Sequence, residues 1–290
     1  MGDFFHASAK LNLYLHITGK REDGYHLLDS LTAPIMGIFD RVSIKKSNSF
    51  SLDIHGPFAT LIAHEDPQTN LASRAAHALA AHLGHAPSVA ITLEKNIPPG
   101  AGLGGGSADA AATVKALLQF WNAMIREDDL HALLLSLGSD VPACYAGKQV
   151  LMRGTGDIIE PAPILPALPF VLIWPGMPSS TPAAYKAYRP PFSAPATLPD
   201  EFTEKSFVEF LKVQANDLYA PALQSVPVIA DALAALEQQK GRLLCRMSGS
   251  GSACFGLFAD ESDAVNAAES ISRSAPSPWW VRRGVLSSRH

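Results

Sequence analysis

PPGAGLGGGSADAAA, from Pro98 to Ala112, is the stretch of sequence that decides the fold. Five glycines fall between residues 100 and 106, the alternating segment 89–94 before them predicts a strand, and residues 107–121 after them have strong helix composition. Glycine has no Cβ, so this backbone can approach a ligand closely, and the helix N-terminus adds N–H groups at the positive end of a dipole. The order strand, glycine loop, helix therefore predicts an anion cradle suited to phosphates.

Two better-known phosphate loops fit this stretch less well. The Walker A pattern needs a lysine that is missing here. The dinucleotide spacing is matched formally by Gly100, Gly102 and Gly105, but Pro98-Pro99 separates the strand from the turn, and no βαβαβ series is evident. A flexible surface turn, or tight packing between helix and strand, is the purely structural alternative.

The rest of the chain alternates between strand and helix patterns, with proline crowded between residues 161 and 199. Asn70 is a suitable N-cap for the first expected helix, and the tract 190–199 is predicted to be a surface loop. The mixture predicts an α+β protein with two domains, residues 1–155 and 156–290. Strands are expected at 4–17, 30–38, 41–45, 89–94, 170–174, 253–258 and 279–281, and helices at 70–83, 107–121, 130–137, 206–213, 228–239 and 264–270.

Bulk composition narrows the function classes. The 290 residues are 47% apolar and carry a net charge of −4, which argues against nucleic acid as a partner. Three cysteines without a Cys-x-x-Cys pair favour a reduced, cytoplasmic setting. Neither a signal-peptide layout nor an apolar run of membrane-spanning length is evident, so no membrane association is expected.

A second informative stretch is SAKLNLYLHITGKREDGYHLLDSL, from Ser8 to Leu31. Lys10 and Asn12 stand two apart on an expected strand and so share one face. They could be ordinary solvated residues, and Tyr25-His26 could be the aromatic flank of a turn.

Two shorter stretches complete the set. LGSDVPAC, residues 137–144, places Asp140 between a helix end and a proline, where an aspartate often caps a helix or closes a turn. SGSGS, residues 248–252, is a second glycine-rich turn, which could be no more than a tight hairpin-like connection.

Together these stretches resemble the GHMP kinases, which include galactokinase, homoserine kinase and mevalonate kinase. Their second motif reads like Pro-x-Gly-x-Gly-Leu-Gly-Ser-Ser-Ala. This chain carries Pro98, Gly100, Gly102, Leu103, Gly104, Ser107 and Ala108 on that pattern, with Gly105-Gly106 before the serine. The run Arg21-x-Asp23-Gly24-Tyr25-His26, after Ala-Lys-x-Asn-Leu, is similar to the opening of one family among them, the 4-diphosphocytidyl-2-C-methyl-D-erythritol kinases. The segment 70–76, the Gly-x-Asp-Val-Pro at 138–142 and the turn at 248–252 follow in the family's order.

The resemblance implies a fold and a reaction. It implies an N-terminal domain like domain 2 of ribosomal protein S5 and a ferredoxin-like α+β C-terminal domain. The reaction would be ATP-dependent phosphorylation of the 2-hydroxyl of the cytidylylated methylerythritol in the non-mevalonate isoprenoid pathway, with Mg²⁺ and a protein that is a monomer or weak homodimer.

The resemblance also implies residue roles. Lys10 and Asp140 would be catalytic, the turn at 248–252 would support the loop and the substrate, and the acceptor would bind Asn12, Tyr25, His26, Thr181 and Tyr185. A Tyr25–Tyr185 sandwich could hold the cytosine. ATP would bind Asn70, Lys95, Pro98, Gly100, Ala101, Gly102, Leu103, Gly104, Gly105, Gly106, Ser107 and Ala108.

Three rival functions remain at this point. A homoserine or mevalonate-type kinase would share the glycine loop but not the Asp23-to-His26 run. A non-catalytic nucleotide-binding protein would not need both Lys10 and Asp140. A dinucleotide oxidoreductase would bind NAD. The chain departs from the family pattern at Thr32–Met36 and at Asp157, which leaves contacts from loops to the substrate open.

Overall fold

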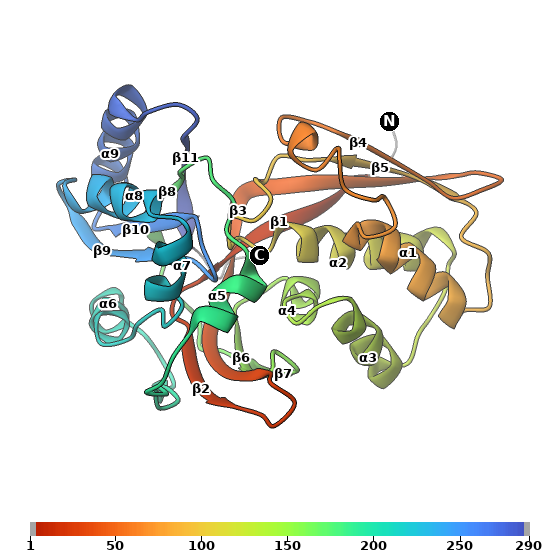
Figure 1. The fold of residues 1–290 in the computed structure, drawn as a ribbon, viewed down its shortest axis with the longest axis horizontal. Coiled ribbons are helices and arrows are strands. Elements are labelled where there is room, and N and C mark those ends of the chain that lie inside the picture. Colours follow the sequence, from red (N-terminus) through yellow and green to blue (C-terminus); the bar gives the residue numbers. More distant parts are fainter. Residues whose placement is uncertain (1–3, 287–290) are drawn as a thin grey trace. The chain divides into compact units, whose positions relative to one another are not determined.

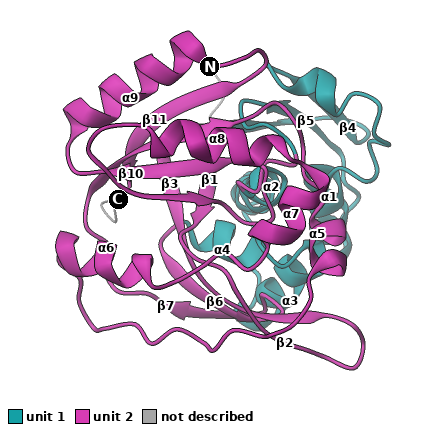
Figure 2. Cartoon of the chain, turned by 60° about the vertical axis from the view of Figure 1, so that its left-hand side comes forward, with its two compact units in different colours: residues 1–9, 38–99, 104–147 teal, residues 10–37, 100–103, 148–290 magenta. Residues whose placement is uncertain are grey.

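The computed structural model describes residues 4–286, which form two compact units that interleave along the chain (Figures 1 and 2). Unit 1 comprises residues 1–9, 38–99 and 104–147, and unit 2 comprises residues 10–37, 100–103 and 148–290. The two units are therefore not separated by a single boundary in the sequence, and the domain division at residue 155 stays a prediction. No helix within the described residues is long and apolar enough to cross a membrane.

Unit 1 combines helices with the edge of a sheet. Its helices are α1 (Leu71–His82), α2 (Gly105–Phe120), α3 (Glu127–Leu137) and α4 (Val141–Ala146), with a short 3-10 turn, η1 (Ala59–Leu61). Strand β5 (Val89–Glu94) pairs antiparallel with the later part of β3 (His26–Lys46) and parallel with β4 (Ser51–His55). The strand predicted at 89–94 is confirmed.

Small side chains let the helices of unit 1 pack closely. Helix α1 buries Ala72, Ala75 and Ala76, and α2 buries alanines from Ala108 to Ala112. Both faces contribute to one apolar core with Leu79 and strand residues such as Ile91. Burial of this kind contributes about 25 cal/mol per Å² of apolar surface, so the core holds α2 firmly against α1.

Unit 2 contains two groups of strands. The first is the early part of β3 with β2 (His16–Lys20), β6 (Val150–Gly154) and β7 (Ile158–Pro161). The second is an antiparallel sheet in the order β11 (Trp280–Leu286), β8 (Leu168–Trp174), β10 (Cys254–Phe258), β9 (Arg242–Met247). Helices α8 (Val228–Glu237) and α9 (Glu261–Ser274) pack on this second sheet. Unit 2 also contains α5 (Thr181–Ala187), α6 (Glu204–Lys212) and α7 (Tyr219–Ser225). Strand β1 (Phe5–Asn12), which pairs with β3, begins in unit 1 and ends in unit 2.

Several expected elements differ from the structure. The strand predicted at 4–17 is two strands, β1 and β2, separated by residues 13–15. The strands predicted at 30–38 and 41–45 are one long strand, β3, although Gly37 has φ +81°. Pairing with β6 before Gly37 and with β5 after it keeps the backbone of β3 extended. Residues 190–199 contain no helix or strand, as predicted.

Candidate active site

Residues 100–103 of the glycine loop are held through their carbonyl groups, all within unit 2. Each of the four carbonyl oxygens accepts one hydrogen bond from a distant segment, so the loop is fixed from one side and is not a flexible surface turn. The donors are Ser179 N (to Gly100, 2.7 Å), Ala253 N (to Ala101, 2.9 Å), Ser248 Oγ (to Gly102, 3.0 Å) and Lys10 N (to Leu103, 2.9 Å).

Two glycines of the loop could not be replaced without distortion. Gly100 and Gly102 have φ of +63° and +73°, which side-chain-bearing residues rarely adopt. A Cβ on Gly100 would lie 2.6 Å from the Cβ of Pro178, and one on Gly102 would overlap the carbonyl oxygen of Ser248. The glycines are therefore required by the backbone and its neighbours.

The start of α2 has the features of an anion-binding helix end in unit 1. Gly104 precedes the helix in the left-handed region with φ +67°, offers no capping side chain, and the first turn contains no acidic residue. The N–H groups of Gly105, Gly106 and Ser107 have no acceptor within the helix and lie at the positive end of its dipole. This end of α2 fits a phosphate group.

Lys10 and Asn12 are not solvated surface residues. Their exposed fractions are 5% and 3%, and the Lys10 ammonium group donates to Asn12 Oδ1. Asn12 Nδ2 donates to Ser30 Oγ at 2.8 Å, and Ser30 Oγ donates to Tyr14 O at 2.6 Å. The side chain of Asn12 therefore has a fixed orientation and helps to hold the lysine ammonium.

Ser248, which sequence reasoning did not single out by itself, connects the Lys10 strand to the glycine loop. It is fully buried, and its hydroxyl accepts from Asn12 N at 3.1 Å while donating to Gly102 O. Asn216 holds the same turn, because its Nδ2 donates to Met247 O and Gly249 O at 2.8 Å each. The turn at 248–252 is thus more than a tight connection between strands.

Asp140 occupies the N-cap position of α4 but does not cap the helix. Its carboxylate makes no capping hydrogen bond, and the side chain is half-buried. Its side chain therefore does not act as a helix cap. Asp140 does lie in a turn, because Val141 N donates to Gly138 O at 3.1 Å. Asp140 belongs to unit 1 and Lys10 to unit 2, and a shared catalytic role for them stays a prediction.

Of the residues predicted to bind the acceptor, His26 and Tyr185 lie side by side in unit 2. The turn 21–25 is closed by Arg21 N donating to Tyr25 O at 2.7 Å, and it leaves Tyr25 66% exposed. The ring of His26 lies 5.6 Å from that of Tyr185. Burial, with the nearby charge of Lys20, lowers the pKa of His26, so its imidazole is neutral at pH 7. Thr181, at the start of α5, bonds through its Oγ1 to Ser250 Oγ at 2.7 Å.

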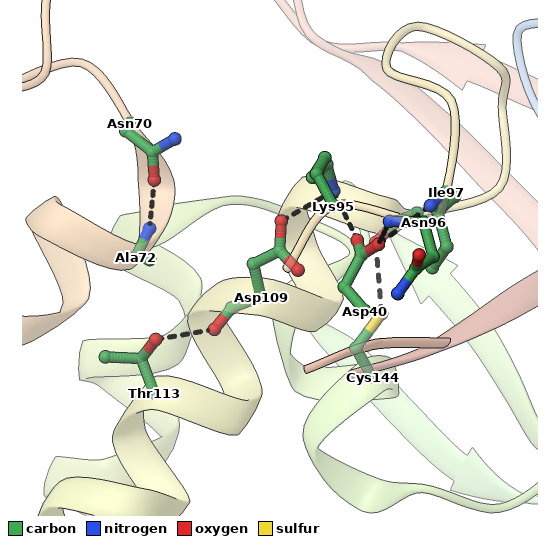
Figure 3. Close-up of polar contacts among 10 residues, drawn as sticks. Asp40, Asn70, Ala72, Lys95, Asn96, Ile97, Asp109, Thr113 and Cys144 are labelled. Carbon is green, nitrogen blue, oxygen red and sulfur yellow. Dashed lines mark hydrogen bonds and ion pairs between the residues drawn. The ribbon is translucent and has the colours of Figure 1, made fainter. Parts of the chain in front are cut away.

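Asn70 has a clear structural use. Its side chain caps α1 by accepting from Ala72 N at 2.9 Å, as the sequence predicts (Figure 3). Its contact with ATP stays a prediction.

Lys95 is enclosed by two carboxylates. It is 2% exposed, and its ammonium group contacts Asp40 and, at 2.7 Å, Asp109 (Figure 3). Burial lowers the pKa of Lys95, but the two carboxylates outweigh burial and raise it, so the lysine stays charged. Its side chain is therefore engaged within unit 1, and an ATP contact through that side chain stays a prediction. Sequence reasoning missed Asp40 and Asp109.

Comparisons with known proteins agree with this arrangement. A family model described as GHMP kinases N terminal domain matches residues 70–148, and one described as GHMP kinases C terminal matches residues 202–277. The α+β fold with both GHMP kinase domains is thus confirmed. A crystal structure of a homoserine kinase from Cytophaga hutchinsonii covers 99% of this chain and 95% of its own at a TM-score of 0.71, but at 18% identity it supports the fold alone.

Relatives of higher sequence identity indicate the family within the GHMP kinases. The chain is 43% identical to a 4-diphosphocytidyl-2-C-methyl-D-erythritol kinase from Paramagnetospirillum magneticum, over 97% of this chain and 98% of the relative. It is 45% identical to one from Paracoccus denitrificans, over 98% and 97%. A crystal structure of a 4-(cytidine 5'-diphospho)-2C-methyl-D-erythritol kinase is 34% identical, covers 99% of this chain and 100% of its own, and has a TM-score of 0.77. The chain belongs to the 4-diphosphocytidyl-2-C-methyl-D-erythritol kinase family of GHMP kinases.

Proposed function

We propose that the chain transfers the γ-phosphoryl group of ATP to the 2-hydroxyl of 4-diphosphocytidyl-2-C-methyl-D-erythritol, a step of the non-mevalonate isoprenoid pathway. The observation that carries this proposal is the hydrogen bond from Lys10 N to the carbonyl of Leu103. It places the backbone of the candidate catalytic lysine directly beside the candidate phosphate loop. The names of the relatives supply the acceptor.

The nucleotide would bind with its phosphates on residues 100–108. The fixed loop backbone and the uncapped first turn of α2 support this, because both suit an anion and the first turn itself contains no acidic residue. Mg²⁺ is proposed as the ion that accompanies ATP, since such ions are held largely by phosphate oxygens and water, and it would neutralise charge on the transferring group.

The acceptor chemistry would depend on Asp140 and Lys10. A tertiary hydroxyl is a poor nucleophile at neutral pH, so Asp140 would orient it and take its proton as the bond to phosphorus forms. Lys10, held by Asn12, would balance the charge that develops on the transferred group.

Recognition of the cytosine is proposed for Tyr25, His26 and Tyr185. The exposure of Tyr25 supports stacking on a pyrimidine, and the neutral imidazole of His26 can both donate and accept a hydrogen bond. Tyr185 lies beside His26, which supports a shared role. We also propose a cytoplasmic location, supported by the absence of any disulfide among the three cysteines.

The test is transfer from radiolabelled ATP to three acceptors offered separately: the cytidylylated methylerythritol, homoserine and mevalonate. Asp140→Asn is compared with Asp53→Asn, a matched change on the exposed strand β4. The proposal expects labelling of the first acceptor alone, retained in Asp53→Asn and reduced at least ~100-fold in Asp140→Asn. Labelling of homoserine or mevalonate instead would reject the acceptor, and ATP binding without transfer to any of the three would reject the kinase.

A further inference from the structure

A buried group of three charged residues lies directly behind the first turn of α2. Asp40 on β3, Lys95 just after β5 and Asp109 in the second turn of α2 have exposed fractions of 0%, 2% and 3%. We call them the Asp40–Lys95–Asp109 cluster (Figure 3). All three belong to unit 1.

The charges of the cluster do not balance if every group is ionised. Two carboxylates face one ammonium group, which leaves one net negative charge removed from water. An unmatched buried charge is strongly unfavourable, and the usual outcome is that a group binds or releases a proton.

The hydrogen bonds show which carboxylate is the better ionised partner. Asp40 Oδ2 contacts the Lys95 ammonium, and Asp40 Oδ1 accepts from the backbone N–H groups of Asn96 and Ile97, the latter at 2.7 Å. Three donors favour the charged form of a carboxylate. Asp109 Oδ2 accepts from Lys95, but its Oδ1 is buried and has no hydrogen-bond partner among the described residues. The extra proton therefore belongs on Asp109.

The cluster touches the start of α2 at Gly105. A Cβ on Gly105 would lie 3.2 Å from Lys95 Nζ and 3.0 Å from Ile97 Cγ2, so the helix start rests on the cluster. A net negative charge here would oppose an anion at the helix N-terminus, whereas a neutral cluster would not.

We propose that the Asp40–Lys95–Asp109 cluster positions the phosphate-binding end of α2 and does so in a neutral form, with Asp109 protonated at physiological pH. Asp109 is thus a positioning residue, and the bound triphosphate stabilises its protonated form. The link to the helix end rests on the proposed binding of ATP at α2, whereas the protonation of Asp109 does not.

Burial supports this assignment. It raises the pKa of Asp109; Lys95 lowers that pKa and Asp40 raises it further, and the result is about 8. Other titratable groups on the helices against α2 face different partners: His77 of α1 packs on Phe50, and Cys144 of α4 contacts Gly104 O at 3.9 Å. The acidic residues of α3 lie at its first turn, away from the buried face.

The first arm of the test detects the protonation of Asp109 in the absence of nucleotide, through the pH dependence of stability. The unfolding equilibrium is compared for the unchanged protein, Asp109→Asn, which mimics the protonated acid, and the exposed control Asp53→Asn. Because the pKa of Asp109 is raised in the folded state, its stabilisation is lost as pH rises. The unchanged protein should lose stability relative to Asp109→Asn by about tenfold in the unfolding constant per pH unit between about pH 6 and 8, then level off. Asp53→Asn should follow the unchanged protein, and a difference that stays flat with pH would overturn the proposal.

The second arm measures ATP affinity across the same range. The unchanged protein should lose affinity roughly tenfold more than Asp109→Asn between about pH 6.5 and 9, because the negative cluster repels the triphosphate. Equal slopes, with the first arm positive, would reject the link to the helix end. Failure of both proteins to bind ATP at any pH would reject the proposed function while leaving the proton assignment to the first arm.

Discussion

The variant Lys95→Met distinguishes a structural role of Lys95 in the buried cluster from a direct contact between Lys95 and ATP. Methionine keeps most of the apolar stem and removes the ammonium group, so packing changes little. Asp40, the ionised carboxylate of the cluster, is then left buried without its counter-charge beside the neutral Asp109. An unmatched buried charge is strongly unfavourable, so Asp40 must also take up a proton.

The magnitude follows from the proton that the variant must take up. Holding one more aspartate neutral at pH 7, about three pH units above its ordinary pKa, costs about 1.4 kcal/mol per unit, or about 4 kcal/mol in the free energy of unfolding. This agrees with the 3–5 kcal/mol range, roughly, for removing one partner of a buried ion pair. The affected carboxyl has a raised pKa in the folded variant, so the loss should shrink to about 1.5 kcal/mol near pH 5 and grow above pH 7.

The assay is urea unfolding followed by far-UV circular dichroism at about pH 5, 7 and 8.5, a range in which this cost changes. Lys45→Met is the matched control, because Lys45 is an exposed lysine on β3 in the same unit. It should change stability by less than about 0.5 kcal/mol at every pH. If Lys95→Met were as stable as Lys45→Met and showed only a raised KM for ATP, the reasoning would be refuted and a direct ATP contact supported.

Four further predictions test the rest of the site. Ser248→Ala leaves Asn12 N–H and Gly102 C=O buried without their hydrogen-bond partner. Urea unfolding should therefore show a free energy of unfolding lower by about 2 kcal/mol, and the kinetics should show a lower kcat. An unchanged kcat would contradict a positioning role for Ser248. Gly102→Ala should raise the KM for ATP and lower stability by more than about 1 kcal/mol, measured by the same two assays, and wild-type values would contradict the required backbone conformation. Tyr25→Ala should raise the KM for the cytidylylated acceptor about tenfold without changing that for ATP, and a shift in the ATP value instead would reassign Tyr25. The KM for the cytidylylated acceptor should stay constant above about pH 6.5 and rise only at lower pH, because the pKa of His26 is lowered and the ring is neutral above that pH. A change in this KM between pH 7 and 8 would contradict a neutral ring.

The sequence was sufficient for features that depend on local pattern. The strand at 89–94 alternates in polarity and was predicted with the observed bounds, and Asn70 caps α1 as its residue type suggests. The glycine loop was recognised because glycine density and a following helix are both local signals. These features need no knowledge of what lies across the fold.

Features that depend on distant partners were missed. Asp40 and Lys95 are 55 residues apart, and nothing in either local pattern indicates that they meet. Lys95 between a strand and a loop has the pattern of a surface residue. The short strands β4, β6 and β7 were not predicted either, because they are extended mainly through pairing with neighbouring strands.

Ser248 shows a further limit of sequence reasoning. The Gly/Ser turn was noted, but which of its serines matters depends on the hydroxyl lying between Asn12 N and Gly102 O. Two serines of the turn, Ser248 and Ser252, are fully buried, so residue type alone could not decide between them.

The most direct test of the central claim is the product formed from ATP and 4-diphosphocytidyl-2-C-methyl-D-erythritol, identified by phosphorus and carbon NMR. The account predicts ADP and a new phosphate monoester on the carbon that bears the 2-hydroxyl, in equal amounts. A phosphate on another hydroxyl group, or ADP released without a phosphorylated acceptor, would contradict it.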